Sequence, residues 1–231
     1  MEHCLHSMRE LQETHKQGFS VQQIKDIMHD VCSALEFLHK QNIVHMDIKP
    51  GTFLKIFINA IKENILYSRT RKYKLADLGL ARIAQRSQGE EIEEGDGRYL
   101  AAEILNDMVE PMPDLRKADI FSFGMCMYEF AVGERLPTNG DEWHAIRGGE
   151  IPKLQENRKK LPQDLIMSIQ SMMSLDPNKR PSATQLLQIP CLLSEKDIQL
   201  KWEQTQNEWN KEKIKELEHL LQIRPSRRKS F

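Results

Sequence analysis

Residues 119–133, DIFSFGMCMYEFAVG, most constrain how this chain can fold. Nearly every side chain in this run is apolar, and the run is too short to span a bilayer. A helix that is apolar on every side has to be enclosed by other elements. With 231 residues the chain is long enough to enclose it. The sequence therefore predicts a mainly α-helical domain with this segment at its centre.

The surrounding segments predict a helical bundle with a few short β-strands. Residues 20–40 have a capping box at Ser20 and Gln23 and an apolar face at helical spacing. Residues 161–190 read as two amphipathic helices joined by a proline-bounded turn. Residues 42–50 read as a strand-like loop closed by Pro50, and residues 72–81 as a strand that runs into a turn at Gly79. Residues 51–72 look irregular, as an insertion between two short strands does.

Composition excludes several classes of protein. The 33 Lys and Arg residues balance 34 Asp and Glu residues, which argues against nucleic-acid binding through bulk positive charge. The four cysteines have no CxxC spacing, so we expect reduced thiols and neither a zinc site nor a disulfide framework. No run is long enough to cross a membrane, and residues 1–20 lack a signal-peptide core. These features predict a soluble, intracellular protein.

The C-terminal part differs from the rest in composition. Residues 194–223 form a charged helix without Pro or Gly, in which Trp202 and Trp209 are seven residues apart. The heptad is not sustained, so we expect a helix that packs on the domain or pairs with a partner, with a coiled coil as the less favoured alternative. Residues 224–231 are basic, and we expect them to form a disordered tail. The predicted domains are thus residues 1–193, 194–223 and 224–231.

Two short motifs carry the residue types that phosphoryl transfer requires. Asp47 and Lys49 in HMDIKP lie two residues apart in an extended loop, so that they can face the same way. One carboxylate has to orient the acceptor hydroxyl, and a nearby lysine can neutralise the transferred group. Asp77 in ADLGL is a candidate Mg²⁺ ligand, because Gly79 allows the backbone to turn sharply beside an ion.

HMDIKP followed by DLG resembles the catalytic loop and metal motif of eukaryotic protein kinases. Three further residues match structural positions of the C-terminal lobe in the same order: Glu103 in LAAEIL, Asp119 in KADIFSFG and Arg180 in LDPNKRPSA. EEGDGRYLAAEIL, KADIFSFG and LPTNGDEWHAIRGGEIP are together similar to the Wee1 kinases. The resemblance covers residues 1 to about 193 and implies the C-terminal lobe of a protein kinase domain.

The resemblance implies a function and roles for single residues. It implies ATP and Mg²⁺ as co-substrates, a tyrosine of a cyclin-dependent kinase as the substrate, and a nuclear or cytoplasmic location. Asp47 and Lys49 would be catalytic, Lys49, Asp77 and the hinge residue Cys4 would contact the nucleotide, and Asp77 and Thr52 would be the metal positions. Thr52 stands where the family has an asparagine, so we expect weaker binding of the second metal.

The resemblance also implies structural roles. We expect His45 to bond the backbone near Asp77. We expect Asp119 to anchor the catalytic loop from below and to accept backbone N–H bonds at the start of its own helix. We expect Glu103 and Arg180 to form a buried pair.

A further departure from the kinase pattern concerns activation. Met46 replaces the arginine that in many kinases binds a phosphate on the activation loop, so order of that loop should not need phosphorylation. The acidic side chains at 90, 91, 93, 94 and 96 are expected to pair with nearby basic groups instead.

No glycine-rich loop and no nucleotide-binding lysine precede His45, so Met1 is expected to lie inside a longer kinase and this chain to be nearly inert. Two alternatives remain open. One is a non-catalytic pseudokinase or scaffold that binds a cell-cycle kinase. The other is a Ser/Thr kinase of the same group, which Lys49 favours.

Overall fold

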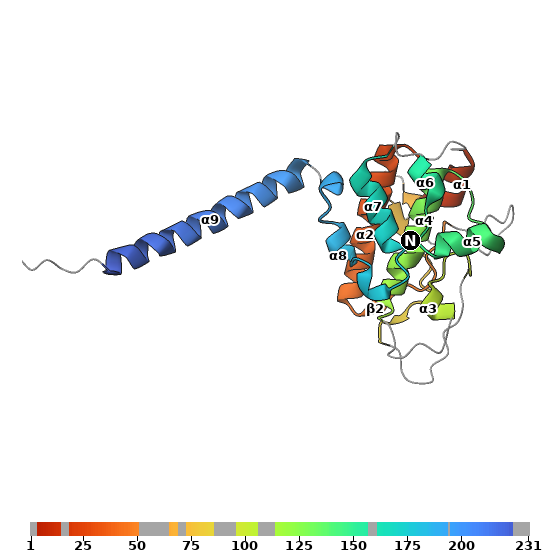
Figure 1. Cartoon of the computed structure of the whole chain (residues 1–231), viewed down its shortest axis with the longest axis horizontal. Coiled ribbons are helices and arrows are strands. Elements are labelled where there is room, and N and C mark those ends of the chain that lie inside the picture. Colours follow the sequence, from red (N-terminus) through yellow and green to blue (C-terminus); the bar gives the residue numbers. More distant parts are fainter. Residues whose placement is uncertain are drawn as a thin grey trace, which may run out of the picture. The chain divides into compact units, whose positions relative to one another are not determined.

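A computed structural model describes residues 4–14, 19–50, 65–68, 73–85, 96–105, 114–156, 161–193 and 195–223. The chain divides into two compact units, Met1–Leu192 and Leu193–Phe231, and each is described by itself (Figure 1). Most of the described residues are helical, with a few short strands. This confirms the mainly α fold expected from the sequence.

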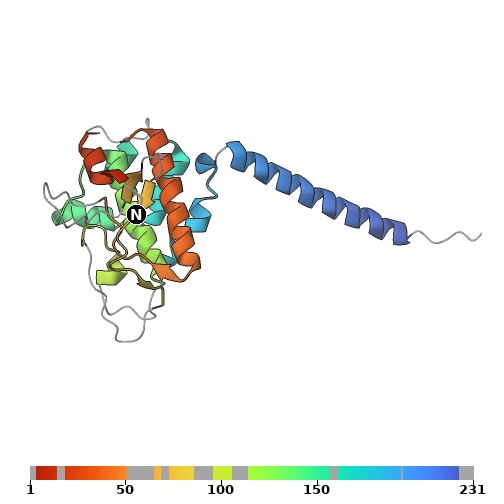
Figure 2. The same cartoon turned by 180° about the vertical axis from the view of Figure 1, so that it is seen from behind.

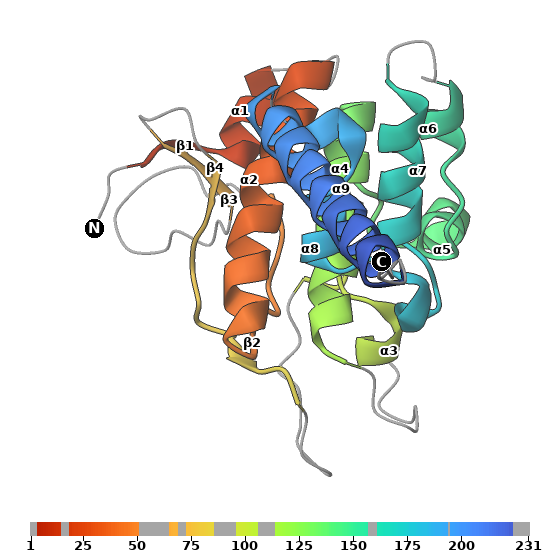
Figure 3. The ribbon, with the colours of Figure 1, turned by 90° about the vertical axis from the view of Figure 1, so that its left-hand side faces the viewer.

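Helix α4 (Arg116–Val132) is the centre of the first unit, as its composition predicted. Every residue from Ala118 to Phe130 is buried. α4 packs between α2 (Val21–Lys40) and α7 (Gln163–Met172), and Figure 3 shows these helices side by side. A Cβ atom at Gly124 would lie 2.9 Å from Cβ of Met172, so this glycine allows α4 and α7 to approach closely.

Helix α2 forms where its sequence pattern placed it. Ser20 Oγ accepts a hydrogen bond from Gln23 N at 3.3 Å, and Gln23 Oε1 accepts one from Ser20 N at 3.0 Å, so the capping box is confirmed. The apolar face of α2 is buried, and its C-terminal end leads into β2 through Asn42, which has a φ of 59°. This turn places the following loop at the end of the helical core.

The strands form two small antiparallel sheets. The first has the order β1-β3-β4, with β1 at Cys4–Ser7, β3 at Ile65–Ser68 and β4 at Tyr73–Leu75. It lies beside α2 on the side away from α7 (Figure 3). The second sheet pairs β2 (Ile43–Val44) with β5 (Arg82–Ile83).

The expectation of an irregular segment is wrong for Ile65–Ser68, because this β-branched and aromatic run hydrogen-bonds to a strand on each side. Residues 51–64 and 69–72 lie outside the described residues.

The remaining helices are mostly short. They are α1 (Met8–Thr14), α3 (Ala102–Leu105), α5 (Gly140–Arg147), α6 (Pro152–Glu156), α8 (Ala183–Leu186), and the 3₁₀ turns η2 (Pro177–Lys179) and η3 (Pro190–Leu192). The second amphipathic helix expected within 161–190 is therefore only the four residues of α8. Prolines at 177, 181 and 190 prevent a longer one.

Helix α9 (Glu195–Ile223) forms the second unit, and Figure 2 shows it as one continuous helix. Among the described helices, none combines the length and the apolar composition that crossing a membrane requires.

Candidate active site

The catalytic-loop motif begins at the end of β2, and the DLG motif lies between β4 and β5. Because β2 pairs with β5, the loop that carries Asp47 begins beside the strand at which the loop that carries Asp77 ends. His45 Nε2 lies 3.1 Å from the carbonyl oxygen of Ala76, the residue before Asp77. This confirms the structural role expected for His45 and places the two motifs beside one another.

The surroundings of His45 define its tautomer. A carbonyl oxygen only accepts, so Nε2 carries the proton and donates to Ala76. The other ring nitrogen, Nδ1, accepts from the backbone N–H of Asp47 at 3.4 Å. The imidazole is therefore neutral in this arrangement, and it links the backbone of both motifs.

Asp119 fixes the start of the same loop from the buried side. Its carboxylate is 1% exposed and accepts from His45 N and Met46 N, both at 2.9 Å. His39 Nε2 lies 2.9 Å from the same group. Both backbone bonds are charge-assisted and compensate the burial of the carboxylate.

The expected anchoring role is confirmed, although the bonded amides belong to the loop and not to the first turn of α4. Met46 has a φ of 65°, which these bonds hold in place.

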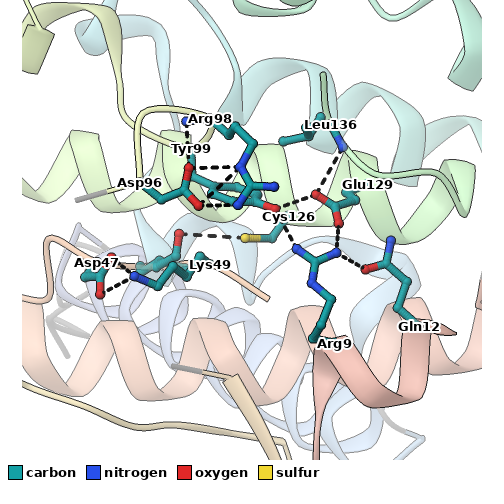
Figure 4. Close-up of polar contacts among 11 residues, drawn as sticks. Arg9, Gln12, Asp47, Lys49, Asp96, Arg98, Tyr99, Cys126, Glu129 and Leu136 are labelled. Carbon is teal, nitrogen blue, oxygen red and sulfur yellow. Dashed lines mark hydrogen bonds and ion pairs between the residues drawn. The ribbon is translucent and has the colours of Figure 1, made fainter. Parts of the chain in front are cut away.

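Asp47 and Lys49 face one another, as their spacing suggested. Lys49 Nζ donates to both carboxylate oxygens of Asp47, at 2.7 and 2.8 Å. Both side chains are largely buried, and the pair is visible at the lower left of Figure 4. Each of these oxygens has a second lone pair, so the carboxylate can accept a further hydrogen bond while it is paired with Lys49.

Asp77 is exposed and adopts a left-handed conformation with a φ of 61°. Its Oδ1 accepts a hydrogen bond from Gly79 N at 3.1 Å. A Cβ atom at Gly79 would lie only 3.0 Å from this oxygen, so a side chain at this position would displace the Asp77 carboxylate. The positive φ lies at the aspartate itself, where an Asp tolerates it better than most residues.

The site fits a hard cation only in part. Carboxylate oxygens are the ligands that Mg²⁺ prefers, and the exposed carboxylate of Asp77 provides them. No group of three or more His, Cys, Asp or Glu side chains converges within the part of the chain that the structure describes. Thr52, the second expected metal position, lies outside that part, as does the side chain of Cys4, whose backbone begins β1.

The turn at residues 96–99 carries a second group of polar side chains next to this pair. Asp96 accepts from Arg98 Nε at 3.0 Å and from Arg98 Nη2 at 2.5 Å (Figure 4). Burial opposes ionisation of Asp96, but the hydrogen bonds from Arg98 outweigh it and lower the pKa of the carboxyl, with a smaller contribution from Lys49. Acidic pairing is thus confirmed for Asp96, whereas residues 86–95 lie outside the described part.

A buried ionic cluster, which was not predicted from the sequence, positions Tyr99, the residue after Arg98. Tyr99 Oη donates to Glu129 at 2.6 Å and accepts from Arg9 at 3.0 Å. Arg9 also pairs with Glu129 at 2.5 Å and donates to Gln12 at 2.8 Å (Figure 4). Burial, with the Glu129 charge, raises the pKa of Tyr99 well above its usual range. Glu129 within the apolar run was the available signal, because a lone acid there needs a buried partner.

Arg147 connects this turn to α5. It is 5% exposed and donates from Nη1 to the carbonyl oxygen of Gly97 at 3.1 Å. Its guanidinium lies over the ring of Trp143, with 4.5 Å from Cζ to the ring centroid. The EEGDGRYL and LPTNGDEWHAIR motifs, both part of the sequence resemblance, therefore touch one another here.

Glu103 and Arg180 form the expected buried pair, with N–O distances of 2.5 and 2.8 Å. Arg180 also donates to the backbone carbonyls of Ser174 at 2.7 Å and Lys117 at 2.9 Å. The pair therefore ties α3 to the start of α4 and to the segment before η2. Its burial and its bonds to backbone carbonyls indicate a structural role.

Comparison with known proteins places this geometry in a family context. Residues 1–192 match the model of the protein kinase domain. The chain is 36% identical to Wee1-like protein kinase 1-B of Xenopus laevis over 185 residues, which cover 77% of this chain and 30% of that protein. It is 37% identical over 172 residues to the membrane-associated tyrosine- and threonine-specific cdc2-inhibitory kinase of Drosophila melanogaster, covering 74% and 29%. The chain thus spans about a third of the length of the curated relatives it matches.

Proposed function

Because the chain belongs to the protein kinase family and resembles the Wee1-like kinases within it, we propose that it transfers phosphate from ATP to a protein hydroxyl. The observation that carries this proposal is the bond from His45 to Ala76, which sets the motifs of Asp47 and Asp77 side by side. Asp119 holds the first of these motifs through two backbone bonds. Since the relatives are about three times longer, activity, substrate and partner are proposals for this chain.

The proposal gives a distinct task to each of three residues, Asp47, Lys49 and Asp77. Asp47 orients the acceptor hydroxyl and receives its proton on a lone pair that Lys49 does not use. Lys49 then neutralises charge on the transferred group. Asp77 holds Mg²⁺, with position 52 as the second candidate ligand. Protein kinases in general use ATP with Mg²⁺, and the ion neutralises the phosphate charge when it is bound.

For the substrate, we propose a tyrosine of a cyclin-dependent kinase. The Drosophila relative is by its name a tyrosine- and threonine-specific inhibitor of cdc2. This name supports a cell-cycle kinase as the partner and leaves a threonine hydroxyl as the alternative acceptor. A nuclear or cytoplasmic location is proposed from the family resemblance alone. Phosphoamino-acid analysis of the product distinguishes the two.

A second candidate function is a non-catalytic scaffold that binds a cell-cycle kinase. The observation in its favour is that Thr52 stands where the family has an asparagine, so one of the expected metal ligands is a weaker one. This candidate requires neither nucleotide binding nor phosphate transfer by the chain.

The experiment incubates the purified chain with labelled ATP, Mg²⁺ and a cyclin-dependent kinase. Because the chain by itself is expected to be nearly inert, we expect slow transfer by the wild type, which falls by about 10²–10⁴-fold in Asp47→Asn. Asp141→Asn, an exposed aspartate on α5, is the matched control and should retain the wild-type rate. Mg-ATP should also raise the melting temperature of the wild type more than that of Asp77→Asn. A chain that shows neither transfer nor a thermal shift, yet binds the cell-cycle kinase, is the scaffold instead.

A further inference from the structure

Helix α9 is rich in charged residues, but one side of it carries a stripe of exposed, mostly apolar side chains. Ile198, Trp202, Thr205 and Trp209 follow one another at spacings of four, three and four, so they share one side of the helix. The apolar members are 53%, 60% and 58% exposed in that order. Two exposed tryptophans that lie two turns apart on the same side of a helix indicate an interaction surface.

We propose that this stripe binds the same stripe of a second copy of the chain, with the two helices antiparallel. In the register that superposes the stripe on itself, Ile198 faces Trp209 of the second copy, and Trp202 faces Thr205 of the second copy. Each layer then combines one large and one smaller side chain, which fills the space between two helices evenly. The arrangement needs no segment beyond the described helix.

The charges on α9 favour this orientation over the parallel one. Beyond Trp209 the stripe continues at Glu212 and Glu216. Parallel, in-register helices would place each glutamate against its own copy, and like charges facing one another destabilise a helix pair. The antiparallel register leaves both glutamates beyond the overlap, and it brings position 201, a lysine, near Glu208 of the second copy.

The size of the surface sets the expected strength. Residues 198–209 span about 18 Å of helix, so each copy contributes two tryptophans and little else. The buried area stays below the roughly 1,200–2,000 Å² of a stable interface. We therefore expect a weak dimer with a dissociation constant on the order of 10–100 µM, which forms at high local concentration.

Sedimentation equilibrium of the full chain, from about 5 to about 300 µM, measures this association directly. The average mass should rise from that of one copy towards that of two across this range. Trp202→Gln with Trp209→Gln should weaken the association at least about tenfold. Leu200→Gln with Leu217→Gln is the matched control, because both leucines are exposed on α9 outside the stripe, and it should dimerise as the wild type does.

A charge exchange tests the orientation. Glu208→Lys alone should weaken the dimer, and adding Lys201→Glu should restore it, since the two positions meet only between antiparallel copies. A parallel pair sets Glu208 near Lys213 of the second copy, so the second substitution would not restore it there. A chain that stays monomeric at the highest concentration, or a dimer unaffected by loss of both tryptophans, overturns the proposal. The test involves no kinase assay, so its outcome is independent of the proposed function.

Discussion

Removing the charge of Glu129 should destabilise the first unit more than any single hydrogen bond can explain. Arg9, Tyr99 and Glu129 are 1%, 2% and 0% exposed, so water cannot replace a lost partner. In Glu129→Gln the Arg9 guanidinium remains buried and charged beside a neutral amide. Breaking a buried ion pair by removing one partner typically costs about 3–5 kcal/mol of unfolding free energy.

Two companion variants separate the charge from the hydrogen bonds. Tyr99→Phe removes the hydroxyl that donates to Glu129 and leaves the Arg9–Glu129 pair intact. It should cost about 1.5–3 kcal/mol, as a hydrogen bond to a charged group does. Arg9→Met with Glu129→Leu removes both charges together. Because no unpaired charge remains, the double variant should be more stable than Glu129→Gln.

Urea unfolding followed by far-UV circular dichroism measures these differences, with unchanged m-values as the criterion for comparable transitions. Glu150→Gln, at an exposed position after α5, is the control for loss of a surface acid and should change the unfolding free energy by less than about 0.5 kcal/mol. The reasoning is refuted if Glu129→Gln is as stable as this control, or if the double variant is no more stable than Glu129→Gln.

Four further outcomes follow from the geometry of the site. The pKa of Tyr99 is raised in the folded state, so stability should fall as pH rises above about 10, with a smaller slope in Tyr99→Phe by chemical unfolding. The pKa of Asp96 is lowered in the folded state, so the stabilisation by this carboxylate is present above about pH 4 and is lost as the pH falls further. The unfolding free energy of Asp96→Asn should therefore fall less than that of the wild type on acid titration. Asp119→Asn loses one acceptor oxygen for the two loop amides and should cost about 1–3 kcal/mol, with faster hydrogen exchange at those amides. Gly79→Ala forces the Asp77 carboxylate to move and should reduce the thermal shift produced by Mg-ATP more than it reduces stability.

The sequence was informative wherever a short motif fixes its own contacts. His45, Asp119 and the Glu103–Arg180 pair were expected from the order of motifs, and the structure confirms each contact. The catalytic tasks of Asp47 and Asp77 remain predictions.

The cluster around Glu129 could not be predicted in the same way. Arg9 is 120 residues away from it in the sequence and lies on a short helix with no motif of its own. Only the folded arrangement of α1 beside α4 brings the two charges together. The sequence indicates that Glu129 needs a buried partner, because it is an acid in an otherwise apolar helix. The sequence does not identify which basic residue that partner is.

One helix sets the spacing between the two parts of the candidate site. Asp119 holds the loop of Asp47, and Glu129 holds Tyr99 at the turn that begins with Asp96. Both acids lie on α4, ten residues or about 15 Å apart along its axis. Because α4 is buried from Ala118 to Phe130, neither anchor can shift without disrupting the core. Order at residues 96–99 therefore comes from charges built into the core, which explains how this turn is positioned although Met46 cannot bind a phosphate.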